Sequence, residues 1–188
     1  MAIKHSSGKA KARKCQNWTA EQISNLINMP WGKDEVIAPR EMGQSGVDVR
    51  LVADARECFP FSVECKWIEV LAIPAWIKQA RENKGDGLDW LLIAKQNHKP
   101  YLAVLEAEVL LDLVALSSDA KPFEDGFCCH WKGRWDIWTW FNIANEGSGD
   151  RQGVLFIKRE LEDWIAVVDA LHFFYLLRTI PGKRKGRP

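Results

Sequence analysis

The chain resembles itself at an offset of 64 residues, and this internal repeat is the feature that most limits how it can fold. Residues 61–113 align with residues 125–177 without a gap. Twelve pairs are identical: Cys65/Cys129, Trp67/Trp131, Ile73/Ile137, Trp76/Trp140, Ala80/Ala144, Glu82/Glu146, Gly85/Gly149, Asp86/Asp150, Leu91/Leu155, Ile93/Ile157, Val104/Val168 and Leu113/Leu177. We interpret this as a duplicated strand-helix-strand-strand-helix unit. The alternative is that both stretches merely share a common pattern of strands and helices.

The periodicity of apolar residues predicts which elements make up the first copy and the residues before it. Apolar and polar residues alternate over 46–51 and 61–67, the period of a half-buried strand. This alternation places Asp48 on one face of its strand, and Glu64 and Lys66 together on one face of theirs. Further strands are expected at 89–95 and 101–105, and helices at 18–28, 74–83 and 106–116. The order of elements predicts an α/β (or α+β) fold with a mixed central sheet flanked by helices.

Composition excludes several classes of protein. With 188 residues and 47% hydrophobic content, the chain can bury a sizeable core. It contains no apolar run of the roughly 18 residues that a membrane span needs, and its first residues do not form a secretory signal. We therefore expect a cytoplasmic protein, in the host cell if it is phage-encoded, without a membrane partner. Five scattered cysteines without a paired spacing predict reduced thiols.

Both ends of the chain are basic. Residues 1–14 and 178–188 each carry five Lys or Arg and no acid, so removing these ten charges from a net +1 leaves −9 for the rest. We expect a flexible basic arm at 1–14, a core at 15–116, the degenerate repeat packed on it at 117–178, and a basic tail at 179–188. The arm offers Lys9, Lys11, Arg13 and Lys14 to DNA phosphates. Solvated tails that aid solubility are the alternative.

Two carboxylates and an ammonium are predicted to meet at the surface of the sheet. Asp48 and Glu64 supply the hard oxygen ligands that Mg²⁺ prefers, and Mn²⁺ is expected to substitute for it. Lys66 is placed to orient a water or to stabilise negative charge that develops on a phosphate. A Glu-x-Lys tripeptide by itself more often marks a solvated strand face, so the interpretation depends on the surrounding residues.

Those surroundings resemble the PD-(D/E)xK nuclease superfamily, and in particular the Holliday junction resolvase-like endonucleases of phages and archaea. The matching residues are Glu21, Arg40, the loop Ser45-Gly46-Val47-Asp48, and the strand Glu64-Cys65-Lys66, followed by a helix with Gln79. The resemblance covers roughly residues 10 to 115. Val47 stands where the superfamily's name has Pro, and the C-terminal third has no counterpart in the small archaeal enzymes.

The resemblance implies a restriction-endonuclease-like fold and a homodimeric Mg²⁺-dependent endonuclease that acts on branched DNA. It implies Asp48, Glu64 and Glu21 as metal ligands, Lys66 and Gln79 as further catalytic residues, and Arg40 and Ser45 as phosphate-binding residues. Helix capping beside Thr19 explains Glu21 equally well, turn formation explains Arg40 and Ser45, and simple exposure explains Gln79. Two other functions stay open, namely a duplex or restriction-type nuclease and a non-catalytic DNA-binding or structural protein.

Overall fold

A computed structural model describes residues 3–41, 43–118, 123–131, 137–146, 152–159 and 162–181. Within these residues the chain divides into two compact units, one that ends at Tyr101 and one that runs from Leu102 to Pro181. Each unit contains a mixed sheet with helices packed against it, which confirms the predicted α/β class. The predicted basic tail lies largely outside the described residues.

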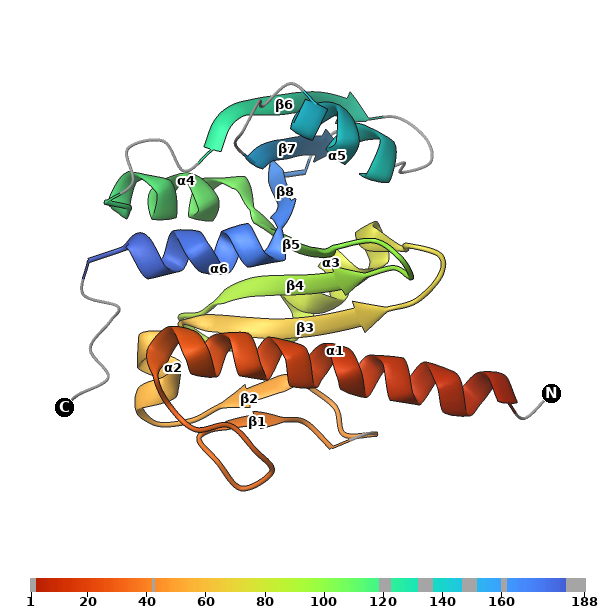
Figure 1. The fold of residues 1–188 in the computed structure, drawn as a ribbon, viewed down its shortest axis with the longest axis vertical. Helices are drawn as coiled ribbons and strands as arrows, with labels where there is room; N and C mark the ends of the chain where they lie inside the picture. Colours follow the sequence, from red (N-terminus) through yellow and green to blue (C-terminus); the bar gives the residue numbers. More distant parts are fainter. Residues whose placement is uncertain are drawn as a thin grey trace. The chain divides into compact units, whose positions relative to one another are not determined.

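The first unit contains seven elements, α1 (Ile3–Ile27), β1 (Ile37–Pro39), β2 (Val49–Leu51), α2 (Asp54–Cys58), β3 (Phe61–Trp67), α3 (Ile73–Glu82) and β4 (Asp89–Lys95). Its strands lie in the order β1-β2-β3-β4. β2 is antiparallel to both β1 and β3, whereas β3 and β4 are parallel and are joined through α3. Figure 1 shows α1 running alongside β3, and α3 behind β4.

Both faces of β3 are covered. On one face the Cys65 thiol contacts the Thr19 hydroxyl of α1 at 3.6 Å, and on the other the Gln79 amide of α3 donates to Glu64 at 2.8 Å. All five residues from Phe61 to Cys65 are consequently buried. The alternating pattern predicted a strand with one exposed face, and this is corrected because α3 packs over the polar face.

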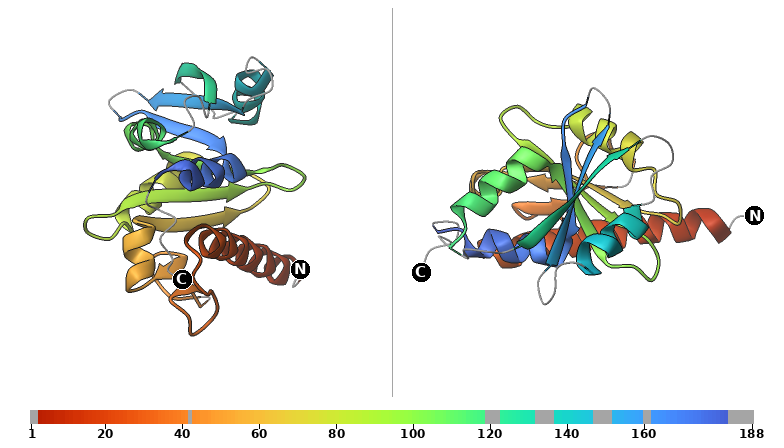
Figure 2. Two further views of the ribbon diagram at one scale, coloured as in Figure 1. Left: turned by 60° about the vertical axis from the view of Figure 1, so that its left-hand side comes forward. Right: turned by 90° about the horizontal axis from the view of Figure 1, so that it is seen from above.

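The second unit contains β5 (Tyr101–Glu106, of which Leu102 onward belongs here), α4 (Ala107–Leu116), β6 (Phe123–Trp131), α5 (Ile137–Glu146), β7 (Gln152–Arg159), β8 (Ile165–Asp169) and α6 (Ala170–Thr179). Its strands lie in the order β5-β8-β7-β6. β6 and β7 are parallel, and β8 is antiparallel to both β5 and β7. α4 and α6 lie side by side (Figure 2). The hydroxyls of Ser117 and Thr179 contact at 2.6 Å.

The predicted repeat has a structural counterpart in both element order and strand register. The bounds of α3 and α5 differ by 64 at each end. Glu64 pairs with Leu92 in β3 and β4, and the residues 64 positions later, Cys128 and Phe156, pair in β6 and β7. β5 and β8 occupy corresponding places in the two copies, and their antiparallel register gives this strand pair a local two-fold symmetry.

The main departure from the predicted elements is α1, which begins at Ile3 instead of near residue 18. The expected flexible arm is thus helical over its described part, because Lys, Ala, Arg and Gln over 9–16 are good helix formers and Cys15 anchors the helix in the core. Thr19 is therefore inside a helix and caps nothing; its hydroxyl donates to the Cys15 carbonyl at 2.9 Å.

Several of the other predicted elements agree with the structure, and some do not. Strands 61–67 and 89–95 are confirmed, as are the helices starting near residues 74 and 106. β1 and α2 were not predicted, because elements of only three and five residues are too short to show a periodic pattern. The boundary between the two compact units follows Tyr101, whereas the sequence predicted a boundary at 116/117. The boundary lies earlier because β5 pairs with β8, a strand of the second unit.

Among the described helices, none has both the length and the apolar character needed to cross a membrane.

Candidate active site

Asp48 lies at the point where the chain enters β2. Its backbone N–H donates to the Val63 carbonyl at 2.8 Å, and Val49 pairs with Val63. These contacts place Asp48 beside the segment of β3 that contains Glu64. The Asp48 carboxylate accepts two hydrogen bonds, one from the Cys65 backbone N–H at 2.8 Å and one from the Gln16 amide at 2.7 Å. Asp48 is thus held by β3 and α1 together.

Glu64 lies at the centre of a polar network between β3 and α3. Its side chain is only 3% exposed. One carboxylate oxygen accepts from the Lys66 ammonium at 2.5 Å and from the Gln79 amide at 2.8 Å, and the other accepts from the Asn83 amide at 3.3 Å. A buried carboxylate requires such partners, because an unpaired charge is costly in the protein interior. The structure therefore brings Asp48, Glu64, Lys66 and Gln79 together.

The surroundings of Glu64 change its acidity. Burial raises the pKa of Glu64, and the nearby charge of Asp48 raises it further, while the hydrogen bond from Lys66 opposes both effects. The net result is a raised pKa, which is a common property of carboxyls that take part in chemistry and also of buried structural ones.

Two members of the network were missed from the sequence. Asn83 follows α3 by one residue and reaches Glu64, and Gln16 in α1 reaches Asp48. The only signal available was helical spacing, since Gln79 and Asn83 are four residues apart and share a helix face. No such signal links Gln16 to Asp48, because only the tertiary packing of α1 brings them together.

The donor set fits a hard divalent cation. The Gln16 side chain is buried, and its amide oxygen has no hydrogen-bond partner among the described residues. This oxygen and the carboxylates of Asp48 and Glu64 are the type of ligand that Mg²⁺ uses together with water. The described residues contain no cluster of three or more Asp, Glu, His or Cys side chains. A cation here would therefore have two carboxylate ligands.

Glu21 does not join the cluster, which corrects the prediction of Glu21 as a third metal ligand. Glu21 is exposed, whereas Gln16 is the α1 residue that contacts Asp48. Five residues along an α-helix correspond to a rotation of about 140°, so these two side chains project from well-separated faces of α1.

The predicted phosphate-binding residues lie in two places. Arg40 is half-buried and donates to the Ser45 carbonyl across the loop before β2, while Ser45 itself is exposed. On α1, Lys9 and Lys14 are exposed, Arg13 is half-buried, and Lys11 forms an ion pair with Glu69 at 2.7 Å. A role of these side chains in DNA binding stays a prediction.

A cavity of about 300 Å³ opens beside the network. Three arginines line it, Arg40, Arg50 and Arg56, and we call it the arginine cleft. Asn83 lines the same cavity while its amide donates to Glu64, so the cleft and the carboxylate site share a wall.

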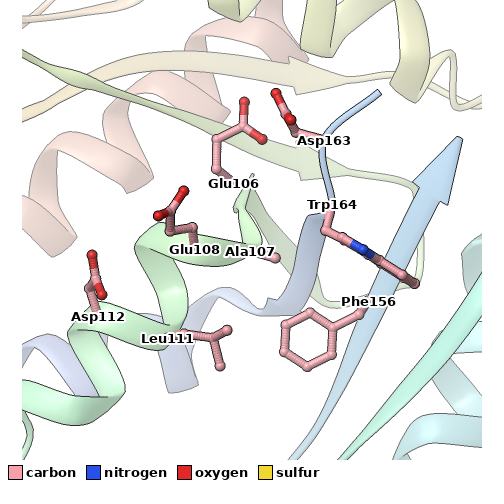
Figure 3. Close-up of a pocket in the computed structure, with 8 residues that line it drawn as sticks. All are labelled: Glu106, Ala107, Glu108, Leu111, Asp112, Phe156, Asp163 and Trp164. Carbon is pink, nitrogen blue, oxygen red and sulfur yellow. The ribbon is translucent and has the colours of Figure 1, made fainter. Parts of the chain in front are cut away.

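The second unit has a larger cavity of about 690 Å³ with a different chemistry. Leu111, Phe156 and Trp164 form its apolar wall, and four carboxylates line it as well (Figure 3). Those carboxylates belong to Glu106, Glu108, Asp112 and Asp163. An acidic lining repels phosphate, so this cavity does not suit a phosphodiester substrate.

No protein-family model, no curated protein and no solved structure matches this chain.

Proposed function

We propose that this chain is a metal-dependent nuclease that hydrolyses phosphodiester bonds of DNA, preferentially branched DNA such as a four-way junction. The observation that carries the proposal is a cluster of three charged side chains on and beside β3. The Asp48 carboxylate is bound to the Cys65 N–H, next to Glu64, and the Lys66 ammonium lies 2.5 Å from Glu64. The preference for branched DNA, the homodimer and Mg²⁺ or Mn²⁺ as cofactor rest on the resemblance to junction resolvases.

The residues of the cluster have separable roles in this proposal. Asp48, Glu64 and the Gln16 amide oxygen would hold the metal ion, which supplies Lewis-acid chemistry when bound. Lys66 is partly exposed and carries a fixed positive charge beside Glu64, where it stabilises negative charge on the phosphate in the transition state. Gln79 and Asn83 orient the Glu64 carboxylate through their amide groups.

The raised pKa of Glu64 makes metal binding depend on pH. The protonated carboxyl is favoured by burial, whereas a cation requires the ionised form. Metal affinity is therefore expected to increase as the pH rises through the pKa of Glu64.

The decisive experiment measures cleavage of labelled four-way junction, linear duplex and single-stranded DNA in Mg²⁺ and in Mn²⁺. We expect the wild type to cut the junction, EDTA to stop the reaction, and Lys66→Ala to slow it about 100- to 1,000-fold, the usual loss when a group that stabilises transition-state charge is removed. Glu64→Gln is expected to abolish it. Glu21→Gln is the matched control, because Glu21 is an exposed carboxylate outside the cluster. Full activity of Glu64→Gln would refute the nuclease site.

A second candidate function is favoured by the burial of Glu64. A carboxylate that is 3% exposed and hydrogen-bonded at both oxygens is also suited to a purely structural network in a DNA-binding protein without turnover. This candidate predicts junction binding without cleavage in every divalent cation tested. Equal cutting of linear duplex and junction would instead support the duplex or restriction-type nuclease.

A further inference from the structure

The arginine cleft carries an unbalanced positive charge. Its arginines come from three separate segments, Arg40 from the loop after β1, Arg50 from β2 and Arg56 from α2. No carboxylate belongs to its lining residues, and within the described part of the chain none of the three arginines forms an ion pair. Three like charges around one cavity, with Arg40 half-buried and Arg50 and Arg56 exposed, create a positive potential that attracts an anion.

Most of the hydrogen-bonding capacity of these arginines is unused. Among the described residues, each of these arginines donates to a single backbone carbonyl, Arg40 to that of Ser45, Arg50 to that of Glu35 and Arg56 to that of Asp86. Each guanidinium has five N–H donors, so most of them remain for a ligand. The Nε atom of Arg40 is buried without any partner among the described residues.

The absence of a side chain at Gly46 leaves room for the guanidinium of Arg40. Gly46 has φ +101°, and a Cβ atom placed on it would lie 3.0 Å from the nearer terminal nitrogen of Arg40. A side chain at position 46 would therefore both strain the backbone and push the guanidinium away. This glycine belongs to the Ser45-Gly46-Val47-Asp48 loop, and the backbone N–H of Arg40 donates to the Asp48 carbonyl at 2.8 Å, which links the cleft to the residue that carries the carboxylate.

Two of the residues that line the cleft, Ser62 and Asn83, belong to the neighbourhood of Glu64. Ser62 lines the cleft and lies two residues before Glu64 on β3, so the two side chains share a face of the strand. The Ser62 hydroxyl is buried and accepts from the Gly85 N–H at 3.0 Å, and no described residue accepts its own proton. Ser62 and Asn83 are thus neutral polar groups between the arginines and Glu64.

We propose that the arginine cleft binds a non-scissile phosphate of the DNA strand whose neighbouring phosphate is cleaved at the carboxylate site. Several guanidinium donors and a hydroxyl donor around one cavity match the oxygens of a phosphate group. The location beside Glu64 assigns the cleft to the strand being cut. This inference rests on the proposed nuclease function and adds the position of the substrate strand.

The test is DNA binding as a function of salt, measured by anisotropy in EDTA so that no strand is cut. The probes are a single strand and a four-way junction. The variant combines Arg50→Gln with Arg56→Gln, because both side chains are exposed. We expect about tenfold weaker binding and a slope of log affinity against log salt that falls by about one. Arg178→Gln, an exposed arginine on α6 in the second unit, is the matched control and should change neither quantity.

Further measurements separate this inference from the proposed function. In a cleavage assay the double variant should raise KM and leave kcat nearly unchanged, because the phosphate bound in the cleft does not react. If the double variant binds DNA as tightly as Arg178→Gln does, with the same salt slope, the cleft proposal is refuted whether or not the wild type cleaves. If the slope falls but the wild type cleaves nothing, only the nuclease proposal fails.

The alternative ligand of the cleft is a small free phosphate compound in place of a phosphate of the DNA strand. Inorganic phosphate and thymidine 5′-monophosphate are titrated against the wild type and the double variant by NMR or calorimetry. Binding of these small anions that is lost in the double variant, with strand binding unaffected, would show a site for small phosphates and would overturn the assignment to the DNA strand.

Discussion

The two copies of the repeat share their backbone and their core but differ in chemistry. The identical residues whose burial is described in both copies are mostly buried, for example Ile73/Ile137, Leu91/Leu155 and Ile93/Ile157. The residues of the network are different. Glu64 corresponds to Cys128, Lys66 to His130, and Gln79 to Ile143, which is 43% exposed.

This difference separates what the fold requires from what the site requires. Packing between sheet and helix restricts the apolar residues in both copies, because interiors are close-packed and tolerate few changes of volume. Nothing in that packing calls for a buried carboxylate and a lysine, and the second copy forms the same strand register without them. The polar network in the first copy is therefore an addition to the fold, which favours a functional role for it.

The largest effect is expected where the two copies are alike. Leu91 and Leu155 occupy corresponding positions, and both are fully buried. Leu91→Ala and Leu155→Ala should each lower the free energy of unfolding by about 2–5 kcal/mol, because each leaves a cavity in a core. Urea unfolding followed by circular dichroism measures both. A decrease in the free energy of unfolding below about 1 kcal/mol at only one of the two positions would contradict the structural equivalence of the copies.

An intermediate effect is expected where the copies differ. The folded state raises the pKa of Glu64, chiefly through burial, so ionising Glu64 costs stability. This cost is absent below the unfolded pKa of about 4.3, grows as the pH rises toward the folded pKa, and is complete above it. Glu64→Gln does not titrate and keeps an acceptor for Lys66 and Gln79. Its free energy of unfolding relative to the wild type should therefore increase from pH 4 to pH 8 when no divalent cation is present.

Urea unfolding at pH 4, 6 and 8 tests this expectation, with Glu21→Gln as an exposed control. A difference between Glu64→Gln and the wild type that stays constant with pH would contradict it. Adding Mg²⁺ sharpens the comparison, since a cation at 100 times its Kd would stabilise the wild type by about 2.7 kcal/mol and leave Glu64→Gln unchanged.

The smallest effect concerns the starts of α4 and α6, which follow the corresponding strands β5 and β8. The Asp169 carboxylate caps α6 by accepting from the backbone N–H groups of Leu171 and His172 at 2.9 and 3.2 Å. Glu106 at the start of α4 makes no such capping bond. Asp169→Ala should lower the free energy of unfolding by about 1 kcal/mol. Glu106→Ala should cost clearly less, and equal costs in thermal or urea unfolding would show that the caps do not distinguish the copies.

The sequence by itself determined the repeat, the strands β3 and β4, the helix α3, and the grouping of Glu64 with Lys66. These depend on short-range periodicity, since a strand alternates its side chains and a helix repeats every 3.6 residues. Even the meeting of Asp48 with Glu64 was predictable, because two adjacent strands joined by a short connection tend to pair.

Only the tertiary structure decided which residues from distant segments contact Asp48 and Glu64. The packing of α1 brought Gln16 to Asp48 and left Glu21 exposed, and the return of the chain after α3 brought Asn83 to Glu64. The arginine cleft likewise could not be predicted from the sequence, because Arg40, Arg50 and Arg56 follow no spacing pattern and line one cavity with Ser62 only in the folded protein. Local periodicity sets which face a side chain occupies, whereas its partners depend on how whole elements pack.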